Sequence, residues 1–195
     1  MNNRRGILIL LVIFFVLGVL VALQPRFDRL LNPAPTPAPE RTSGFQLVFE
    51  EADFNVTDIQ AIRLQSPVTD ESLTLARSAD GTWTATNLEG TFNQEAAANI
   101  ATTIFILPYI YTLPVPEGET LEAFGFANGG DFQVLVLLRD GTEHTIAIGN
   151  PLPSSPEFYA CVDDFCTSEP PTLHIVQRSP IDYLVGLMQA PPLDQ

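Results

Sequence analysis

A continuous apolar run near the N-terminus is the feature that most constrains the fold of this chain. Residues 6–23 contain no charged side chain, no proline and no polar side chain. Because a helix rises about 1.5 Å per residue, the run has the length needed to cross a hydrocarbon core of about 30 Å. We therefore expect a single transmembrane helix, followed by a domain that is attached to a membrane surface.

Three kinds of N-terminal segment carry apolar runs of this type. A cleaved signal peptide has a shorter apolar region, of about 7–15 residues, and ends in a small-x-small site. Here the run ends in Val21-Ala22-Leu23, close to Pro25, without a good pair of small residues. A lipoprotein needs a cysteine at the end of the run, and both cysteines lie far downstream. The sequence therefore predicts an uncleaved signal-anchor.

The charges around the run set its expected orientation. Two arginines and the amino terminus precede the run, and two arginines follow it closely. The positive-inside rule favours a cytoplasmic N-terminus, and long domains cross membranes largely regardless of their charge. We expect residues 1–5 in the cytoplasm, residues 6–23 in the cell membrane, and everything that follows on the extracytoplasmic side.

A proline-rich linker follows the predicted anchor over residues 24–43. Residues 32–39 read Asn-Pro-Ala-Pro-Thr-Pro-Ala-Pro, a pattern that favours extended polyproline II. Such a segment is a semi-rigid spacer, and it would hold the next domain about 20 Å from the bilayer. Residues 44–190 have an ordinary size for one domain with its own core, and residues 191–195 are expected to form a frayed tail.

The predicted domain is strongly acidic. The chain contains no lysine, and from Gly44 onward four arginines stand against 21 acidic residues. Nucleic acids and anionic lipid surfaces repel such a domain, so we expect no nucleic-acid partner. Either the partner is basic or the charge serves only solubility, and the second interpretation is the default.

Cys161 and Cys166 are the only cysteines, and outside the cytoplasm such a pair forms a disulfide. Asp163-Asp164 could be a two-residue turn that places the cysteines opposite each other in a hairpin. Alternatively, the bridge closes the base of a longer loop. A metal site would need two more ligands, for which only His144 and His174 are available, and we expect none.

Alternating apolar residues and turn signals predict an α+β domain, with an antiparallel sheet of hairpins and one or two packed helices. Asp80-Gly81 and Asp140-Gly141 are strong hairpin turns. Asn93 is a good N-cap for a helix that Pro108 ends, and Gly125 is a candidate C-cap. A last helix is expected from Ser179-Pro180. The expected strands lie near residues 45–49, 59–64, 72–77, 82–86, 132–138, 145–148, 158–162 and 172–176.

No set of residues forms a recognisable catalytic, cofactor-binding or metal site. His144 is expected at the surface, and His174 alternates with Leu173 and Ile175, so we expect it in solvent. Trp83 is expected in the core. Glu50, Glu51 and Asp53 lack the spacing of a dedicated calcium loop. No serine lies in a nucleophile-elbow motif, and there is no glycine-rich phosphate loop.

The order of motifs from residue 59 to residue 188 resembles one known family. Asp80-Gly81-Thr82-Trp83 is followed by a helix, by Leu121-Glu122-Ala123-Phe124-Gly125-Phe126, by the Asp140-Gly141 hairpin, and by Ile146-Ala147-Ile148-Gly149. The chain then continues with Phe158-Tyr159 and the strand Leu173-His174-Ile175-Val176 before the final helix. This order is similar to that of domain of unknown function 4340 (DUF4340). The Cys161–Cys166 loop departs from the family pattern.

The resemblance implies an envelope protein with one N-terminal transmembrane helix. Some family members are similar to proteins encoded beside transport ATPases linked to gliding motility. No catalytic residues are established for the family, so none is transferred here. We therefore expect a non-enzymatic, membrane-anchored interaction module, an accessory component of an envelope membrane complex such as a transporter. The alternative is an anchored domain that binds or senses a small ligand, which would need a concave apolar pocket.

Overall fold

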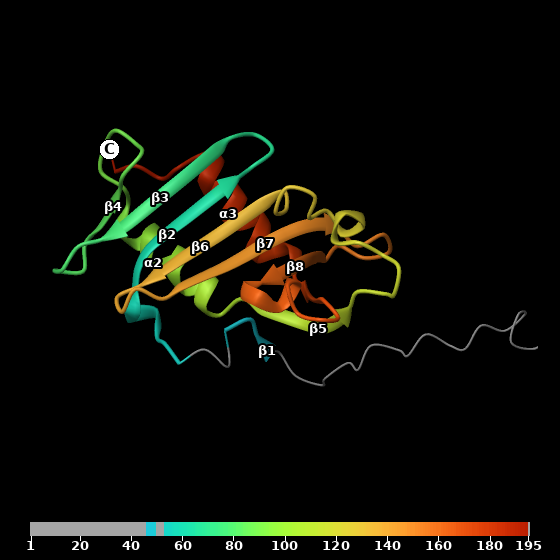
Figure 1. Ribbon diagram of the computed structural model, residues 1–195. Coiled ribbons are helices and arrows are strands. Elements are labelled where there is room, and N and C mark those ends of the chain that lie inside the picture. Colours follow the sequence, from blue (N-terminus) through green and yellow to red (C-terminus); the bar gives the residue numbers. More distant parts are fainter. Residues whose placement is uncertain (1–45, 50–52, 195) are drawn as a thin grey trace, which may run out of the picture. The chain divides into compact units, whose positions relative to one another are not determined.

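The computed structural model describes residues 46–49 and 53–194 (Figure 1). The predicted anchor at residues 6–23 and the linker at residues 24–43 lie outside this part of the chain. Within it, no helix is long and apolar enough to cross a membrane. The described residues belong to one compact unit.

A nine-stranded, fully antiparallel sheet forms the centre of the domain. The strand order is β1-β5-β9-β8-β7-β6-β2-β3-β4. The strands are β1 (Gln46–Leu47), β2 (Ile59–Ser66), β3 (Glu71–Arg77), β4 (Trp83–Ala85), β5 (Pro108–Pro114), β6 (Phe132–Leu138), β7 (Glu143–Pro151), β8 (Phe158–Val162) and β9 (Thr172–Val176). The predicted α+β class with an antiparallel sheet of hairpins is confirmed.

Two Asp-Gly turns fix the registers of the hairpins, as predicted. Gly141 has φ +91°, its amide donates to the carbonyl of Leu138, and the Asp140 Oδ1 atom accepts from the Thr142 amide at 2.9 Å. The turn that contains Asp80 and Gly81 repeats this arrangement. In both turns the threonine amide holds the pKa of the aspartate carboxyl below its ordinary value, because it donates to the charged form.

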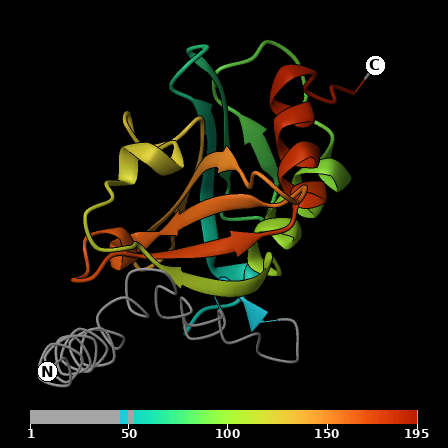
Figure 2. The same cartoon turned by 90° about the vertical axis from the view of Figure 1, so that its right-hand side faces the viewer.

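Two helices pack on one face of the sheet, which we call the helix face: α2 (Gln94–Phe105) and α3 (Arg178–Gln189) (Figure 2). The side chain of Asn93 caps α2 and accepts from the Ala96 amide at 2.9 Å, as predicted. Along the strands, alternate side chains point to this face. With the helices they form the main core, which contains Trp83, as expected, and the largest buried side chains, among them Phe92, Ile62, Leu64, Ile100, Ile104, Ile146 and Ile148.

The opposite face of the sheet is covered over β5, β9, β8 and the end of β7. The 3-10 helix η2 (Leu121–Phe124) lies on this side in Figure 2, and Gly125 ends it in the left-handed conformation, as predicted. The rings of Phe124 and Tyr159 meet edge to face at 5.0 Å between centroids. A second, smaller apolar layer results, made of side chains that are buried outside the main core: Val115, Ala147, Leu173 and Ile175.

Of two predictions about the C-terminal part of the domain, one is confirmed and one is wrong. The last helix is present as α3, and it begins at Arg178, one residue before the expected Ser179, so Pro180 is its third residue. Proline is tolerated there because the first amides of a helix have no acceptor within it. The segment after α3, expected to be frayed, pairs with the residues before α2. The Asn93 amide donates to the Pro192 carbonyl at 3.0 Å, and the Asp194 amide donates to the Thr91 carbonyl at 2.8 Å.

Candidate interaction surface

The half of the sheet that η2 leaves uncovered is an open surface opposite the helices, which we call the open face. It consists of outward side chains of four neighbouring strands, β3, β2, β6 and β7. The apolar and threonine members are half-buried, and Arg63 and Glu143 are exposed. A shallow groove of about 160 Å³ runs along it. The members of the open face are Ala61, Arg63, Thr74, Leu135, Leu137, Glu143 and Thr145.

Two leucines of β6 form the centre of the open face. In the strand register, Leu135 lies between Arg63 and Thr145, and Leu137 lies between Ala61 and Glu143. Directly opposite side chains in neighbouring strands share one face of the sheet. Arg63 therefore lies on one side of the apolar centre, and Glu143 lies on the other. This composition suits a protein contact with an apolar core and a polar rim.

The sequence signal for this surface is the apolar run in residues 134–138, which sequence reasoning treated only as a strand. A strand that is covered on one face alternates apolar and polar residues, whereas an unbroken apolar run is typical of a strand buried on both faces. Helices cover one side of β6 here, and the side that carries Leu135 and Leu137 stays partly in solvent.

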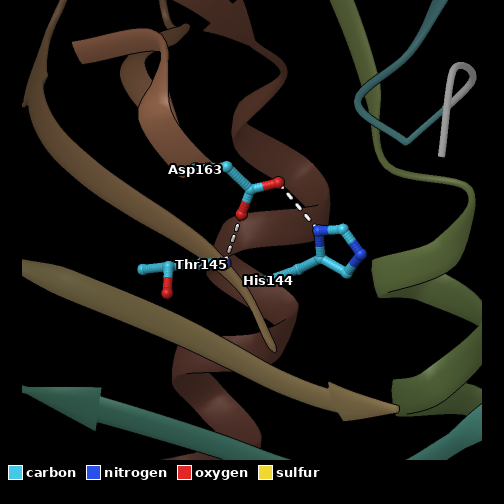
Figure 3. A network of polar contacts seen from close by, with 3 residues as sticks. All are labelled: His144, Thr145 and Asp163. Atoms are coloured by element: carbon cyan, nitrogen blue, oxygen red, sulfur yellow. Dashed lines mark hydrogen bonds and ion pairs between the residues drawn. The ribbon is translucent and has the colours of Figure 1, made fainter. Parts of the chain in front are cut away.

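His144 forms a polar contact with Asp163 in the 3-10 helix η3 (Asp163–Cys166) (Figure 3). Its Nδ1 atom lies 2.8 Å from Asp163 Oδ2, and Asp163 Oδ1 accepts from the Thr145 backbone amide at 2.7 Å. The prediction that His144 is exposed is wrong, because its side chain keeps only 15% of its surface. Opposite Val136 in the register, it lies on the helix face, where Phe49 and Phe54 cover its ring.

Among the described residues, the His144–Asp163 contact includes no side-chain nucleophile. An activated serine, threonine or cysteine needs a hydrogen bond to the base. In the described part of the chain no side-chain hydroxyl or thiol hydrogen-bonds to His144, and Thr145 takes part through its backbone amide. Asp163 directly follows β8, and its carboxylate contacts His144 and Thr145 of β7. These contacts extend the pairing of β7 and β8 beyond the Ile146–Val162 pair.

The cysteines lie at disulfide-bonding distance, as predicted, with 5.7 Å between their Cα atoms. They do not face each other across a hairpin. Cys161 is in β8 and Cys166 ends η3, so the pair brackets η3 at the start of the connection from β8 to β9.

His174 is buried, with 4% of its surface exposed, so the prediction that it lies in solvent is wrong. It does alternate with Leu173 and Ile175, but β9 is covered on both faces. Leu173 and Ile175 point into the smaller layer under η2, and His174 points to the helix face, where its ring meets Tyr109 edge to face at 4.8 Å. Burial lowers the pKa of His174 to about 4.

The remaining candidates do not come together in a site. Glu50 and Glu51 lie outside the described residues, and Asp53 is exposed. Among residues 46–49 and 53–194, no three histidine, cysteine, aspartate or glutamate side chains converge as metal ligands. A second hollow, of about 250 Å³, lies beside α3 on the helix face.

A scan against protein-family models found no match, and searches of curated proteins and of solved structures found no similar protein. The resemblance to the DUF4340 pattern therefore stays a prediction.

Proposed function

We propose that this chain is a non-enzymatic, single-pass interaction module of the cell envelope, with a cytoplasmic N-terminus and an extracytoplasmic domain. It would serve as an accessory component of a membrane complex such as a transporter. The observation that carries the proposal is the open face, where Leu135 and Leu137 belong to a run typical of a strand covered on both faces and yet are only half-buried by the described residues.

The position of the domain on the chain supports a partner in the same membrane. The predicted anchor restricts the domain to the bilayer surface, and the proline-rich spacer sets its height. Tethering converts docking into an encounter at high effective concentration, so a surface of modest size is sufficient. The resemblance to DUF4340, some of whose members are similar to proteins encoded beside transport ATPases, points to the same class of partner.

The test is recovery of partners with the affinity-tagged full-length chain in mild detergent, followed by mass spectrometry. We expect an integral membrane protein in stoichiometric amount. Leu135→Glu combined with Leu137→Glu places two charges in the apolar centre and should abolish the recovery. Ile106→Glu is the matched control, because Ile106 is an exposed apolar residue at the end of α2, away from the open face.

Fluorescence of Trp83, the single tryptophan, reports whether each variant is folded. The proposal fails if no membrane protein accompanies the wild-type chain, or if the folded double variant recovers the same partner as Ile106→Glu does.

A second candidate function is an anchored domain that binds or senses a small ligand. The hollow beside α3 favours it, because its floor is apolar and its rim is polar, as in small-molecule sites.

A further inference from the structure

The hollow on the helix face, which we call the α3 pocket, lies where α3 passes the ends of β6, β7 and β8. Its floor consists of side chains that are almost completely buried: Phe132, Ile148, Ile181 and Met188, with exposed fractions between 2% and 6%. Phe158 and Val185 continue the apolar wall. The volume of about 250 Å³ is just below the range of about 300–1,000 Å³ of drug-sized sites, so the pocket suits a small ligand.

The rim of the α3 pocket carries a single sign of charge. Glu71 begins β3, Asp131 directly precedes β6 and Asp182 is in α3, and no arginine or histidine lines the pocket. No described basic side chain lies within 4 Å of these carboxylates. Thr69 donates its hydroxyl to Glu71 Oε2 at 3.1 Å and holds that carboxylate at the mouth. The pocket therefore combines an apolar floor with a negative potential, which attracts cations and repels anions.

This combination selects the chemistry of the occupant. A bare metal ion is not favoured, because the three carboxylates do not converge as a ligand group. A cation on an apolar body satisfies both parts of the pocket, since its hydrocarbon chain covers the floor while its charge stays at the hydrated rim. The Phe158 ring already carries the Arg178 guanidinium, 4.9 Å from its centroid, so Phe132 is the aromatic side chain of the pocket that remains for an ammonium group.

We propose that the α3 pocket binds a small organic cation of the alkylammonium class, with its chain on the apolar floor and its ammonium group at the acidic rim. The inference rests on the second candidate function. It is independent of the open face, which lies on the opposite side of the sheet, so either can fail without the other.

The chain contains its own probe for this test. Its only methionines are Met1 and Met188, and Met188 is part of the pocket floor. The full-length chain, labelled with methyl-¹³C methionine and held in phosphatidylcholine nanodiscs, is titrated at pH 7 with n-butylammonium, butan-1-ol or butyrate. We expect a saturable shift of the Met188 methyl signal with butylammonium, at least tenfold weaker binding of butanol, and no binding of butyrate. Met1 is the internal reference.

Substitutions at the rim test the role of charge. Glu71→Gln and Asp182→Asn should each weaken butylammonium binding by about threefold, the effect of one exposed charge contact. Glu95→Gln, an exposed carboxylate on α2, should leave it unchanged. Equal binding of butanol and butylammonium, absence of a saturable Met188 shift, or equal effects of the rim and control substitutions would each overturn the proposal.

Discussion

The two histidines show how position alone changes the chemistry of one side chain. Both lie on the helix face of the sheet. His144 is half-buried beside a carboxylate, and it keeps contact with water. His174 is buried between β5 and β8, against Tyr109, and burial lowers its pKa to about 4 because the charged form loses its hydration.

The lowered pKa of His174 predicts a stability that falls in acid. The unfolded chain takes up a proton near the ordinary histidine pKa of about 6.5, whereas the folded chain takes it up only near 4. The contribution of His174 to stability is therefore complete above pH 6.5, and it is lost as the pH falls from 6.5 to about 4. The full loss is about 3 kcal/mol. Urea unfolding of the full-length chain, followed by Trp83 fluorescence, measures it.

The variant His174→Phe is the control for this prediction, because phenylalanine keeps an aromatic ring against Tyr109 and does not titrate. The many carboxylates titrate in both proteins, so their effect cancels in the difference between the unfolding free energies. This difference should change in favour of the variant as the pH falls from 7 to 4. A difference that stays constant over that range would contradict the assignment.

At the scale of elements, the edge strand β4 depends on a side chain for its outer hydrogen bonds. The Gln94 amide occupies the place of a further strand, because it donates to the Trp83 carbonyl and accepts from the Trp83 amide, both at 2.8 Å. Gln94→Ala should lower the unfolding free energy by about 1–3 kcal/mol and speed hydrogen exchange at the Trp83 amide. Asn99→Ala, on the exposed side of α2, should do neither. Unchanged exchange at Trp83 would contradict this role.

The contact between η2 and β7 depends on a glycine. A Cβ atom on Gly149 would collide with the Phe124 carbonyl oxygen and the Phe126 ring, so Gly149→Ala should push η2 away from the sheet and lower the melting temperature. Gly186→Ala in α3 is the opposite case, since a Cβ atom there meets no other atom within 4 Å. It should raise stability by up to about 1 kcal/mol, the helix propensity difference. Thermal unfolding measures both effects: the melting temperature should fall for Gly149→Ala, which disturbs a close contact, and rise for Gly186→Ala, which improves helix propensity.

Elements specified by local chemistry were predictable. The Asp-Gly hairpins, the Asn93 cap and the Gly125 cap each depend on a few consecutive residues, and the structure has all three. The positions of His174 and of the open face were not predictable in the same way. Alternation along a strand assigns two faces, but which face is covered depends on η2, η3 and the helices, which are distant in the sequence. Both faces of β9 are buried because the main core covers one face and the smaller layer under η2 covers the other.

At the scale of the whole domain, the acidic charge has no internal compensation from arginine. In the described part of the chain, no arginine lies within 4 Å of a carboxylate. Arg77 lies over the Trp83 ring and donates to the Gly81 and Thr57 carbonyls, and Arg178 lies over the Phe158 ring and donates to the Pro156 carbonyl. These arginines support loops and aromatic rings, while the carboxylates repel one another.

Screening of that repulsion should therefore stabilise the fold. We expect the melting temperature of the full-length chain in phosphatidylcholine nanodiscs to rise as NaCl is increased from 20 mM to 500 mM, because the screening length falls well below about 10 Å over this range. KCl should act equally if the effect is screening. The triple variant Glu117→Gln, Glu119→Gln, Glu122→Gln, which removes three exposed charges beside η2, should raise the melting temperature at low salt and reduce its salt dependence. A melting temperature that falls with salt would show instead that attractive charge pairs dominate the folded state.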